Sequence, residues 1–263
     1  MMQRKFVTWT EEDGMAIVMI DYAPMNVLSE QVIEELDEVI DEVAEEETVR
    51  SMIISGAGDR AFVAGGNIKD FPKWIGNGKK AGKERALWIQ SIFNKLDRLN
   101  KPTIAAINGM ALGGGSELAL CCDLRIAERH AIFGLPEIKL GLFPGAGGTQ
   151  RLPRLIGKAK AKELMFTGRT VSAEEAEDMG LVNQVVPSGE SLTRAKELMR
   201  EINQFSLPAL SFIKRAVDDG IEKDLEAGLE TEATYFGEVF QTEDVKIGVE
   251  AFINKKKPFF QHR

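Results

Sequence analysis

Apolar residues in the first part of the chain alternate between short continuous runs and stripes with helical spacing. Runs of strand length occur at 15–20, 51–55 and 103–107. Residues 29–47 and 84–99 instead place apolar side chains every three or four positions, which predicts amphipathic helices. Because strands that alternate with helices usually pair in parallel through crossover connections, the pattern predicts an α/β core.

After residue 149 the pattern changes to consecutive amphipathic helices. The segment Ser172-Ala173-Glu174-Glu175 has the form of a capping box, whose helix we expect to end at Gly180. These helices need a partner surface, either the chain's own core or a neighbouring subunit, and both remain open. We therefore divide the chain into a catalytic core, residues 1–195, and a helical C-terminal region, residues 196–263. The further helical stripes cover 192–204, 209–219 and 225–240.

Net charge excludes some classes of partner. The 263-residue chain carries a formal charge of −8 and has an isoelectric point near 5.1. A surface that binds nucleic acid or an anionic membrane needs a basic footprint, so we expect neither partner. The first ten residues hold no apolar segment of signal-peptide length, and no run approaches the roughly 18 apolar residues of a membrane span. We therefore expect a soluble, cytoplasmic protein.

Few residues are available for nucleophilic or metal chemistry. The only cysteines, Cys121 and Cys122, are neighbours in an apolar segment, which predicts buried free thiols rather than a strained disulfide. The histidines are His130, expected at the surface, and His262, close to the C-terminus where little order is expected. A Ser-His-Asp triad, a Cys-His pair or a histidine metal site would all depend on His130. Acid and base chemistry therefore falls to carboxylates.

Three consecutive glycines, residues 113–115, separate an apolar strand from the start of a helix. Glycine lets the chain turn sharply and lets a ligand approach the backbone with no Cβ in the way. The free N–H groups at a helix start favour negative charge, so these amides suit an oxyanion hole for a carbonyl. A second donor is expected in another glycine-rich turn, and Ala64-Gly65-Gly66-Asn67 is the candidate.

Glycine-rich turns before helices also bind nucleotide phosphates, but the turns in this chain do not match those motifs. Leu118 stands where a dinucleotide fingerprint requires its last small residue. The segment Gly145-Ala146-Gly147-Gly148-Thr149-Gln150 lacks the Lys-Ser/Thr pair of a P-loop. These mismatches count against both kinds of nucleotide site.

Glu117 and Glu137 are the candidate acid and base. Glu117 lies in the first turn of its helix, where the dipole alone favours a carboxylate, but the apolar residues that follow predict partial burial. Glu137 lies among apolar residues, with Lys139 near enough for an ordinary surface ion pair. Nothing local brings positions 117 and 137 together, so a two-carboxylate site and two unrelated carboxylates both remain open.

Three blocks in order, residues 60–69, 106–123 and 133–153, resemble the crotonase superfamily and in particular its enoyl-CoA hydratases. The similarity extends from about residue 15 to the C-terminus. It implies a crotonase-like spiral of ββα units followed by trimerisation helices, so that residues 196–263 become an oligomerisation region. The usual assembly implied is a homo-hexamer, built as a dimer of trimers.

The resemblance assigns the chemistry to four residues. It implies that the backbone N–H groups of Gly66 and Gly114 hold a thioester oxygen. The implied reaction is the syn addition of water across the C2–C3 double bond of a 2-enoyl-CoA, with Glu117 deprotonating water and Glu137 exchanging the proton at C2. No metal or separate cofactor is implied, because the N–H groups polarise the thioester and CoA is part of the substrate.

The resemblance also assigns the contacts to CoA. It places the adenine near Ala64 and Ile68 and the phosphates near Arg60. Phe252 and Lys255 are implied to reach in from an adjacent subunit. Cations at the end of the last helix also complement its dipole, which needs no ligand.

At two positions the chain departs from the family pattern. Gly66-Asn67 stands where relatives often have Ala-Asp; the amide is kept, and Asn67 is expected to cap a helix that begins near residue 68. Met25 stands where many relatives have a basic residue that contacts CoA. We expect Met25 to line the site without a charge for phosphate.

We expect an enoyl-CoA hydratase that acts in fatty-acid or branched-chain acyl-CoA breakdown. The rivals are a Δ3,Δ2-enoyl-CoA isomerase or other crotonase chemistry on the same scaffold, and a non-catalytic or RNA-binding homologue. The acidic charge argues against RNA, and the presence of both glutamates argues against an inactive homologue. Four aromatic residues are candidates for an acyl tunnel or else ordinary core: Phe71, Trp74, Trp88 and Phe93.

Overall fold

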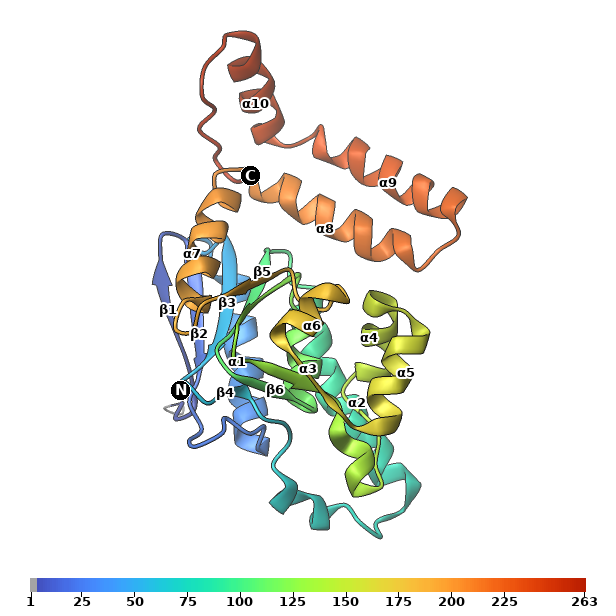
Figure 1. The fold of residues 1–263 in the computed structure, drawn as a ribbon. Coiled ribbons are helices and arrows are strands. Elements are labelled where there is room, and N and C mark those ends of the chain that lie inside the picture. Colours follow the sequence, from blue (N-terminus) through green and yellow to red (C-terminus); the bar gives the residue numbers. More distant parts are fainter. Residues whose placement is uncertain (1–3) are drawn as a thin grey trace.

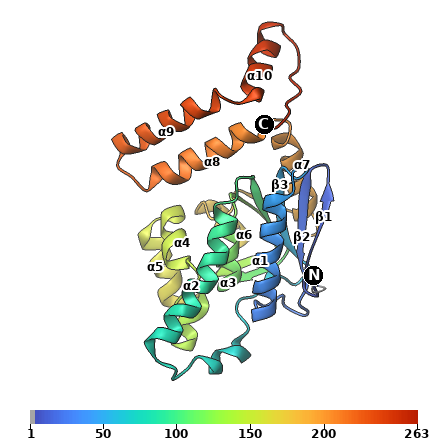
Figure 2. The same cartoon turned by 180° about the vertical axis from the view of Figure 1, so that it is seen from behind.

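Two sheets organise the chain, and the computed structural model describes residues 4–263 (Figure 1, Figure 2). All neighbouring strands are parallel except β1 with β2 and β8 with β9. The larger sheet has the order β1 (Val7–Glu12), β2 (Met15–Ile20), β3 (Ser51–Gly56), β5 (Thr103–Ile107), β7 (Leu124–Glu128) and β10 (Gln184–Val186). The smaller sheet has the order β4 (Ala61–Val63), β6 (Met110–Leu112), β8 (Ile132–Gly134) and β9 (Thr170–Ser172).

The chain repeatedly contributes one strand to each sheet before it continues into helical structure. β3 leads to β4, β5 to β6 and β7 to β8. The first strands of these pairs are adjacent in the large sheet in the order β3, β5, β7, and the second strands are adjacent in the small sheet in the matching order β4, β6, β8. The helices that follow the three pairs are α2 (Gly78–Asp97), α3 (Gly114–Ala119) and α4 (Gly148–Ile156). This succession confirms the predicted α/β spiral of ββα units.

The predicted helix starts at Ser29 and Ser172 are confirmed by their caps. Ser29 Oγ accepts from the N–H of Val32 at 3.2 Å, and Ser172 Oγ accepts from the N–H of Glu175 at 3.1 Å. In the part of the chain that the structure describes, no helix combines the length and apolar character needed to cross a bilayer. The remaining helices are α1 (Glu30–Glu45), α5 (Lys158–Thr167), α6 (Ala173–Asp178), α7 (Ser191–Ile202), α8 (Leu207–Ile221), α9 (Leu225–Val239) and α10 (Glu243–Ile253), with the 3-10 helices η1 (Ile68–Lys73) and η2 (Pro136–Leu140).

Alternate side chains of the large sheet enter two different apolar layers. Ile54 and Ala105 pack in the layer that includes residues of α1 and α2. Their neighbours Ile53 and Ile104 pack in the opposite layer, beneath α7. All four are fully buried. Because both faces of the sheet are covered at its centre, β2, β3 and β5 have the continuous apolar sequences from which they were predicted.

The prediction of uninterrupted helices after residue 149 is wrong, because β9 and β10 lie among them. Each of these strands is three residues long, too short to show a periodic pattern, and each depends on pairing with a partner strand. The start of α2 also differs: the helix begins at Gly78 rather than at residue 84. Its first turns carry exposed lysines and no apolar stripe, so sequence periodicity does not mark them.

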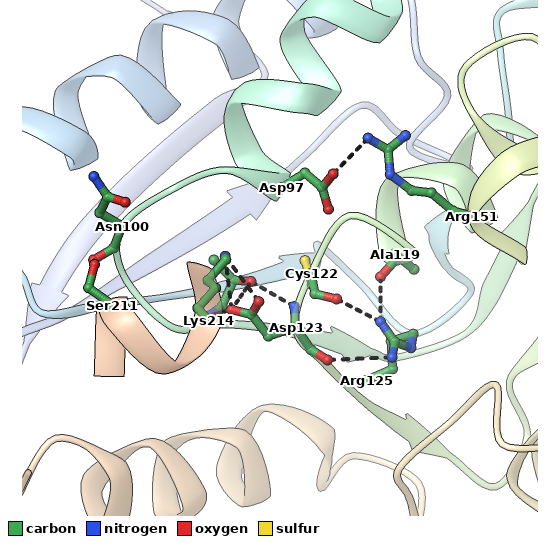
Figure 3. Close-up of polar contacts among 10 residues, drawn as sticks. Asp97, Asn100, Ala119, Cys122, Asp123, Arg125, Arg151, Ser211 and Lys214 are labelled. Atoms are coloured by element: carbon green, nitrogen blue, oxygen red, sulfur yellow. Dashed lines mark hydrogen bonds and ion pairs between the residues drawn. The ribbon is translucent and has the colours of Figure 1, made fainter. Parts of the chain in front are cut away.

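α8 and α9 form a helical hairpin that stands apart from the two sheets in both views (Figure 1, Figure 2). The hairpin touches the core through polar groups: Lys214 Nζ lies 3.0 Å from Asp123 Oδ1, and Ser211 Oγ donates to Asn100 O at 2.9 Å (Figure 3). The large apolar side chains of α8 and α9 that stay exposed are Ile213, Val217, Ile221, Leu225, Leu229 and Phe236.

The C-terminal segment is packed against its neighbours. His262 Nδ1 accepts from the N–H of Leu207 at 3.3 Å, and the His262 N–H donates to Asp244 Oδ2 at 3.0 Å. The expectation of little order at His262 is therefore wrong. The predicted boundary between residues 195 and 196 falls inside α7, where Ala195 and Met199 are core residues.

Gly115 lies where α3 meets β4, and a Cβ at this position would collide with the backbone carbonyl of Val63. We expect Gly115→Ala to lower the free energy of unfolding by about 3 kcal/mol or more, the upper range for overpacking, because backbone cannot rotate away. Urea denaturation measures this change. Gly145→Ala is the control, since nothing lies within 4 Å of a Cβ built there. Equal destabilisation by the two substitutions would contradict the expectation.

Candidate active site

The two glycine-rich turns meet at one edge of the small sheet. β4 and β6 are parallel neighbours, so the turns that follow their carboxyl ends lie side by side. A Cβ built on Gly113 would be 3.8 Å from Gly65 Cα, and one built on Gly114 would be 3.8 Å from Gly66 N. The triple glycine therefore permits a backbone approach that larger residues would obstruct.

The backbone N–H groups of Gly66 and Gly114 do not donate to the hydrogen bonds that their neighbours form in the described part of the chain. The N–H of Leu28 donates to Gly65 O at 2.8 Å, and the N–H of Asn67 donates to Leu28 O at 3.1 Å, so Leu28 bonds to either side of Gly66. Gly114 is the first residue of α3 and has no preceding helical turn to accept its N–H. Within residues 4–263, neither N–H takes part in a hydrogen bond.

Glu117 is buried and held by a third glycine-rich turn, residues 145–148. Its Oε1 accepts from the N–H groups of Ala146 and Gly148, both at 2.8 Å, and only 3 % of the residue is exposed. Burial raises the pKa of Glu117, while the N–H groups of Gly148 and Ala146 and the charge of Arg151 oppose that rise. The turn before α4 is thus an anion site, as helix N-termini often are, but the anion is a side chain of the protein itself.

Glu137 lies on η2 and reaches the triple glycine. Its Oε1 would be 2.9 Å from a Cβ built on Gly113, and its Oε2 is buried without a hydrogen-bond partner in the described part of the chain. Burial, together with the negative charge of Glu117, raises the pKa of Glu137 to about 7. Lys139 is exposed and forms no ion pair with Glu137 among residues 4–263, so the surface-pair alternative does not describe this carboxyl.

The predicted CoA-binding residues fall into three places. The N–H of Ala64 donates to Met25 O at 3.1 Å, which joins the Met25 segment to the turn that carries Gly66. Ile68 begins η1 just beyond that turn and is half exposed, at 50 %. Arg60 is exposed before the start of β4, at the end of the strand away from the glycine turn.

Phe252 lies in the last turn of α10, and Lys255 follows two residues after the helix ends. Both views show α10 far from α3, where the triple glycine lies (Figure 1, Figure 2). Phe252 is 84 % exposed. A single subunit therefore does not bring these two residues to the site.

The expectation that Asn67 caps η1 is wrong. Asn67 occupies the N-cap position, but its side chain makes no capping hydrogen bond. Its Nδ2 donates instead to Asp70 Oδ2 at 2.9 Å. Lys73 donates to the other oxygen of Asp70 at 2.6 Å. The Asp70 carboxylate, inside the first turn, therefore binds the Asn67 side chain in place of the backbone N–H groups that a cap would bind.

Three of the four candidate tunnel aromatics form a wall beside Gly66. A Cβ built on Gly66 would be 3.3 Å from the Phe71 ring, whose centroid lies 5.4 Å from that of Trp74. The Arg85 guanidinium lies between Trp74 and Trp88, 4.5 Å and 4.2 Å from their ring centroids. Phe93, by contrast, is an ordinary core residue that is fully buried.

Two features of this region are absent from the sequence predictions. One is Arg85, for which the spacing of three residues from Trp88 on one helix was the available signal. The other is the turn Gly145–Gly148, which was tested only as a phosphate-binding motif. A turn that fails as a nucleotide site still has free N–H groups, and a buried carboxylate elsewhere in the chain is one possible acceptor.

The site combines two N–H donors that lack a partner within residues 4–263 with two carboxyl groups whose pKa values are raised. Paired backbone donors stabilise negative charge that develops on a carbonyl oxygen. A carboxyl group with a pKa of about 7 can give or take a proton near neutral pH. The arrangement suits acid and base chemistry at carbons next to a carbonyl.

Comparison with known proteins gives the same family. Residues 10–263 match the family model described as "Enoyl-CoA hydratase/isomerase". The chain is 40 % identical to the short-chain-enoyl-CoA hydratase of Clostridium acetobutylicum over 97 % of each chain, and 40 % identical to the crotonyl-CoA hydratase of Syntrophomonas wolfei over 95 % of each. The crystal structure of an enoyl-CoA hydratase from Bacillus anthracis superposes with a TM-score of 0.92 at 38 % identity, covering 98 % of this chain and 100 % of that one. The chain belongs to the enoyl-CoA hydratase/isomerase family, the crotonase family.

Proposed function

We propose that this protein is an enoyl-CoA hydratase that adds water across the C2–C3 double bond of short-chain 2-enoyl-CoA thioesters. The observation that carries the proposal is the proximity of the buried Glu117 and the partly buried Glu137 to two backbone N–H groups that have no hydrogen-bond partner within residues 4–263. The names of the relatives from Clostridium and Syntrophomonas support a short acyl chain, crotonyl-CoA being the four-carbon case.

The thioester oxygen accepts from the N–H groups of Gly66 and Gly114. When a nucleophile adds at C3, the π electrons of the double bond move toward C1 and negative charge develops on that oxygen. The two donors stabilise this enolate-like state more than the neutral thioester, because their positions are fixed by the fold before the substrate binds.

The two glutamates act as base and acid. Oε1 of Glu117 is fixed by the turn before α4, which leaves Oε2 to accept a proton from the attacking water. As the C3–O bond forms, the neutral carboxyl of Glu137 gives its proton to C2 and becomes a carboxylate. One turnover thus moves a proton from Glu137 to substrate and another from water to Glu117, and proton exchange restores the starting state.

We place the CoA moiety against the Met25, Ala64 and Ile68 segments, with Arg60 toward the phosphates. Phe252 and Lys255 complete the CoA site from an adjacent subunit of a homo-hexamer, a dimer of trimers, in which residues 196–263 form the subunit contacts. The exposed apolar residues of α8 to α10 support this assembly, since a monomer rarely leaves so many large apolar side chains in water.

Hydration of crotonyl-CoA, followed as loss of its enoyl absorbance, tests the proposal. We expect the wild type to remove the absorbance, and Glu117→Gln and Glu137→Gln each to lower kcat by about 10²–10⁴-fold, the usual contribution of a general acid or base. Glu34→Gln, an exposed position on α1, is the control and keeps full activity. A wild type that leaves crotonyl-CoA unchanged, but creates a conjugated product from a 3-enoyl-CoA, would show an isomerase instead.

The pH profile follows from the shared proton of the two carboxyl groups. The active form carries one proton on the pair, so kcat/KM is expected to fall as the pH rises through about 7, where Glu137 ionises. Because hydration consumes no net proton, kcat/KM for the reverse dehydration must fall over the same range. The residual activity of Glu137→Gln should lack this fall. A wild-type profile that is flat between about pH 6 and about pH 9 would contradict the assignment.

Glu137 also makes stability depend on pH. Its pKa is about 7 in the folded protein against an ordinary value of 4.5, so the folded state binds the proton more tightly. Stability is therefore lost as the pH rises from about 4.5 to about 7. We expect Glu137→Gln to have a higher Tm than the wild type at about pH 8 and a similar Tm at about pH 4.5, measured by thermal unfolding. A wild type with a higher Tm than Glu137→Gln at about pH 8 would contradict burial of this carboxyl.

A further inference from the structure

The turn that holds Glu117 is itself held by side chains outside the site. The Gly145 carbonyl accepts from Gln90 Nε2 at 2.8 Å. The Ala146 carbonyl accepts from Arg151 Nη1 at 3.5 Å. The Gly147 carbonyl accepts from the backbone N–H of Arg151 at 2.9 Å, which is the first hydrogen bond of α4. Ala146 therefore bonds at its N–H to Glu117 and at its carbonyl to Arg151.

Arg151 is held in turn by one face of α2. Its Nη2 donates to Asn94 Oδ1 at 2.6 Å and to Asp97 Oδ2 at 3.0 Å; Figure 3 shows the contact with Asp97. Gln90, Asn94 and Asp97 are spaced by four and three residues, which aligns them along one side of the helix. A single face of α2 thus supports the whole turn, directly through Gln90 and indirectly through Arg151.

Gly147 makes the close contact with Arg151 possible. It has a φ of +118°, a conformation that favours glycine, and a Cβ at this position would collide with Arg151 Nη1. The guanidinium lies against the backbone where a side chain would otherwise stand. Its side chain is 18 % exposed, so the cation is largely removed from water and faces the turn at short range.

The path from α2 to the base is therefore continuous. Asn94 and Asp97 orient the guanidinium of Arg151, and the guanidinium holds the Ala146 carbonyl, which belongs to the 146–147 peptide. That peptide lies between the two peptides whose N–H groups, from Ala146 and Gly148, orient Glu117 Oε1. The Asp97 contact alone would join α2 to α4, so the additional bond to the middle peptide of the turn is what connects Arg151 to the reaction.

We propose that Arg151, oriented by Asn94 and Asp97, is a positioning residue that fixes the turn at 145–148 and through it the carboxylate of Glu117. The proposal rests on the function proposed above, in which Glu117 activates water. In this role Arg151 acts through Glu117, by presenting the base in one orientation and by keeping a positive charge near it.

Arg151→Gln removes the positive charge and the guanidinium N–H donors to Ala146, Asn94 and Asp97. We expect kcat for crotonyl-CoA hydration to fall about 10²-fold while KM changes less than about threefold, because a base displaced by about 1 Å impairs chemistry and leaves the CoA contacts intact. The acid limb of the kcat/KM profile, where Glu117 becomes protonated, should move to higher pH, since loss of the cation favours the neutral form of Glu117. Added guanidinium ion should restore part of the activity of Arg151→Ala and none of that of Glu117→Gln.

Asp97→Asn tests the same path with little risk to folding, and it should lower kcat in the same direction and by less. Arg154→Gln is the matched control: Arg154 lies on the same helix, is exposed, and pairs with exposed Glu222. We expect it to keep the wild-type kcat, KM and pH profile.

Hydrogen exchange measured on a peptide that covers residues 143–152 gives a readout that needs no turnover. We expect the N–H groups of Ala146 and Gly148 to exchange faster in Arg151→Gln than in the wild type or Arg154→Gln. If these N–H groups exchange at the wild-type rate in Arg151→Gln, the positioning role is overturned. It is also overturned if Arg151→Gln lowers the Tm but leaves kcat and the pH profile unchanged. A wild type that exchanges as expected but does not hydrate crotonyl-CoA would instead overturn the proposed function.

Discussion

The close approach of the two backbone turns at Gly66 and Gly114 is the constraint on which the rest of the site depends. Parallel pairing of β4 with β6 brings the turns to one edge of the small sheet. The absence of side chains at Gly113 and Gly115 lets α3 start against β4 and leaves room for Glu137. Leu28 then bonds to either side of Gly66, which leaves that N–H and the first N–H of α3 without partners in the described part of the chain. Two donors fixed by the fold beside two carboxyl groups form a site that needs little rearrangement to stabilise an enolate-like oxygen.

The carboxyl groups occupy environments that oppose folding and favour acid and base chemistry. Glu117 is desolvated, and the glycine turn before α4 compensates with two N–H donors to one oxygen. Glu137 has a buried oxygen with no hydrogen-bond partner among residues 4–263, and its pKa of about 7 follows from burial and from the charge of Glu117. A buried, unpaired carboxyl destabilises the folded state, so such groups persist where a neighbouring structure holds them. In this protein α2 contributes to that support on two sides, with Gln90, Asn94 and Asp97 at the Glu117 turn and Arg85 and Trp88 in the aromatic wall near Gly66.

Sequence patterns predicted the parts of the fold whose apolar residues repeat regularly. β2, β3 and β5 are buried on both faces and α1 has a clean apolar stripe, so each was visible in the sequence. The strands of the small sheet are three residues long and exist because they pair with one another, which no local pattern records. The triple glycine and Glu117 were found from local chemistry, whereas the convergence of Glu117 with Glu137 came only from the family resemblance. The support by Arg151 depends on contacts between α2 and α4, in which Asp97 and Arg151 are 54 residues apart in the chain, and the sequence offered no signal for it.

The most direct test of the central claim is a crystal structure of the protein with bound butyryl-CoA, the saturated and unreactive analogue of the proposed substrate. The account predicts the thioester oxygen within about 2.7–3.1 Å of both Gly66 N and Gly114 N, with the Glu117 and Glu137 carboxyl groups facing C3 and C2. A thioester oxygen that contacts only one of these nitrogens, or an acyl chain that leaves either carboxyl group remote from C2 and C3, would contradict it.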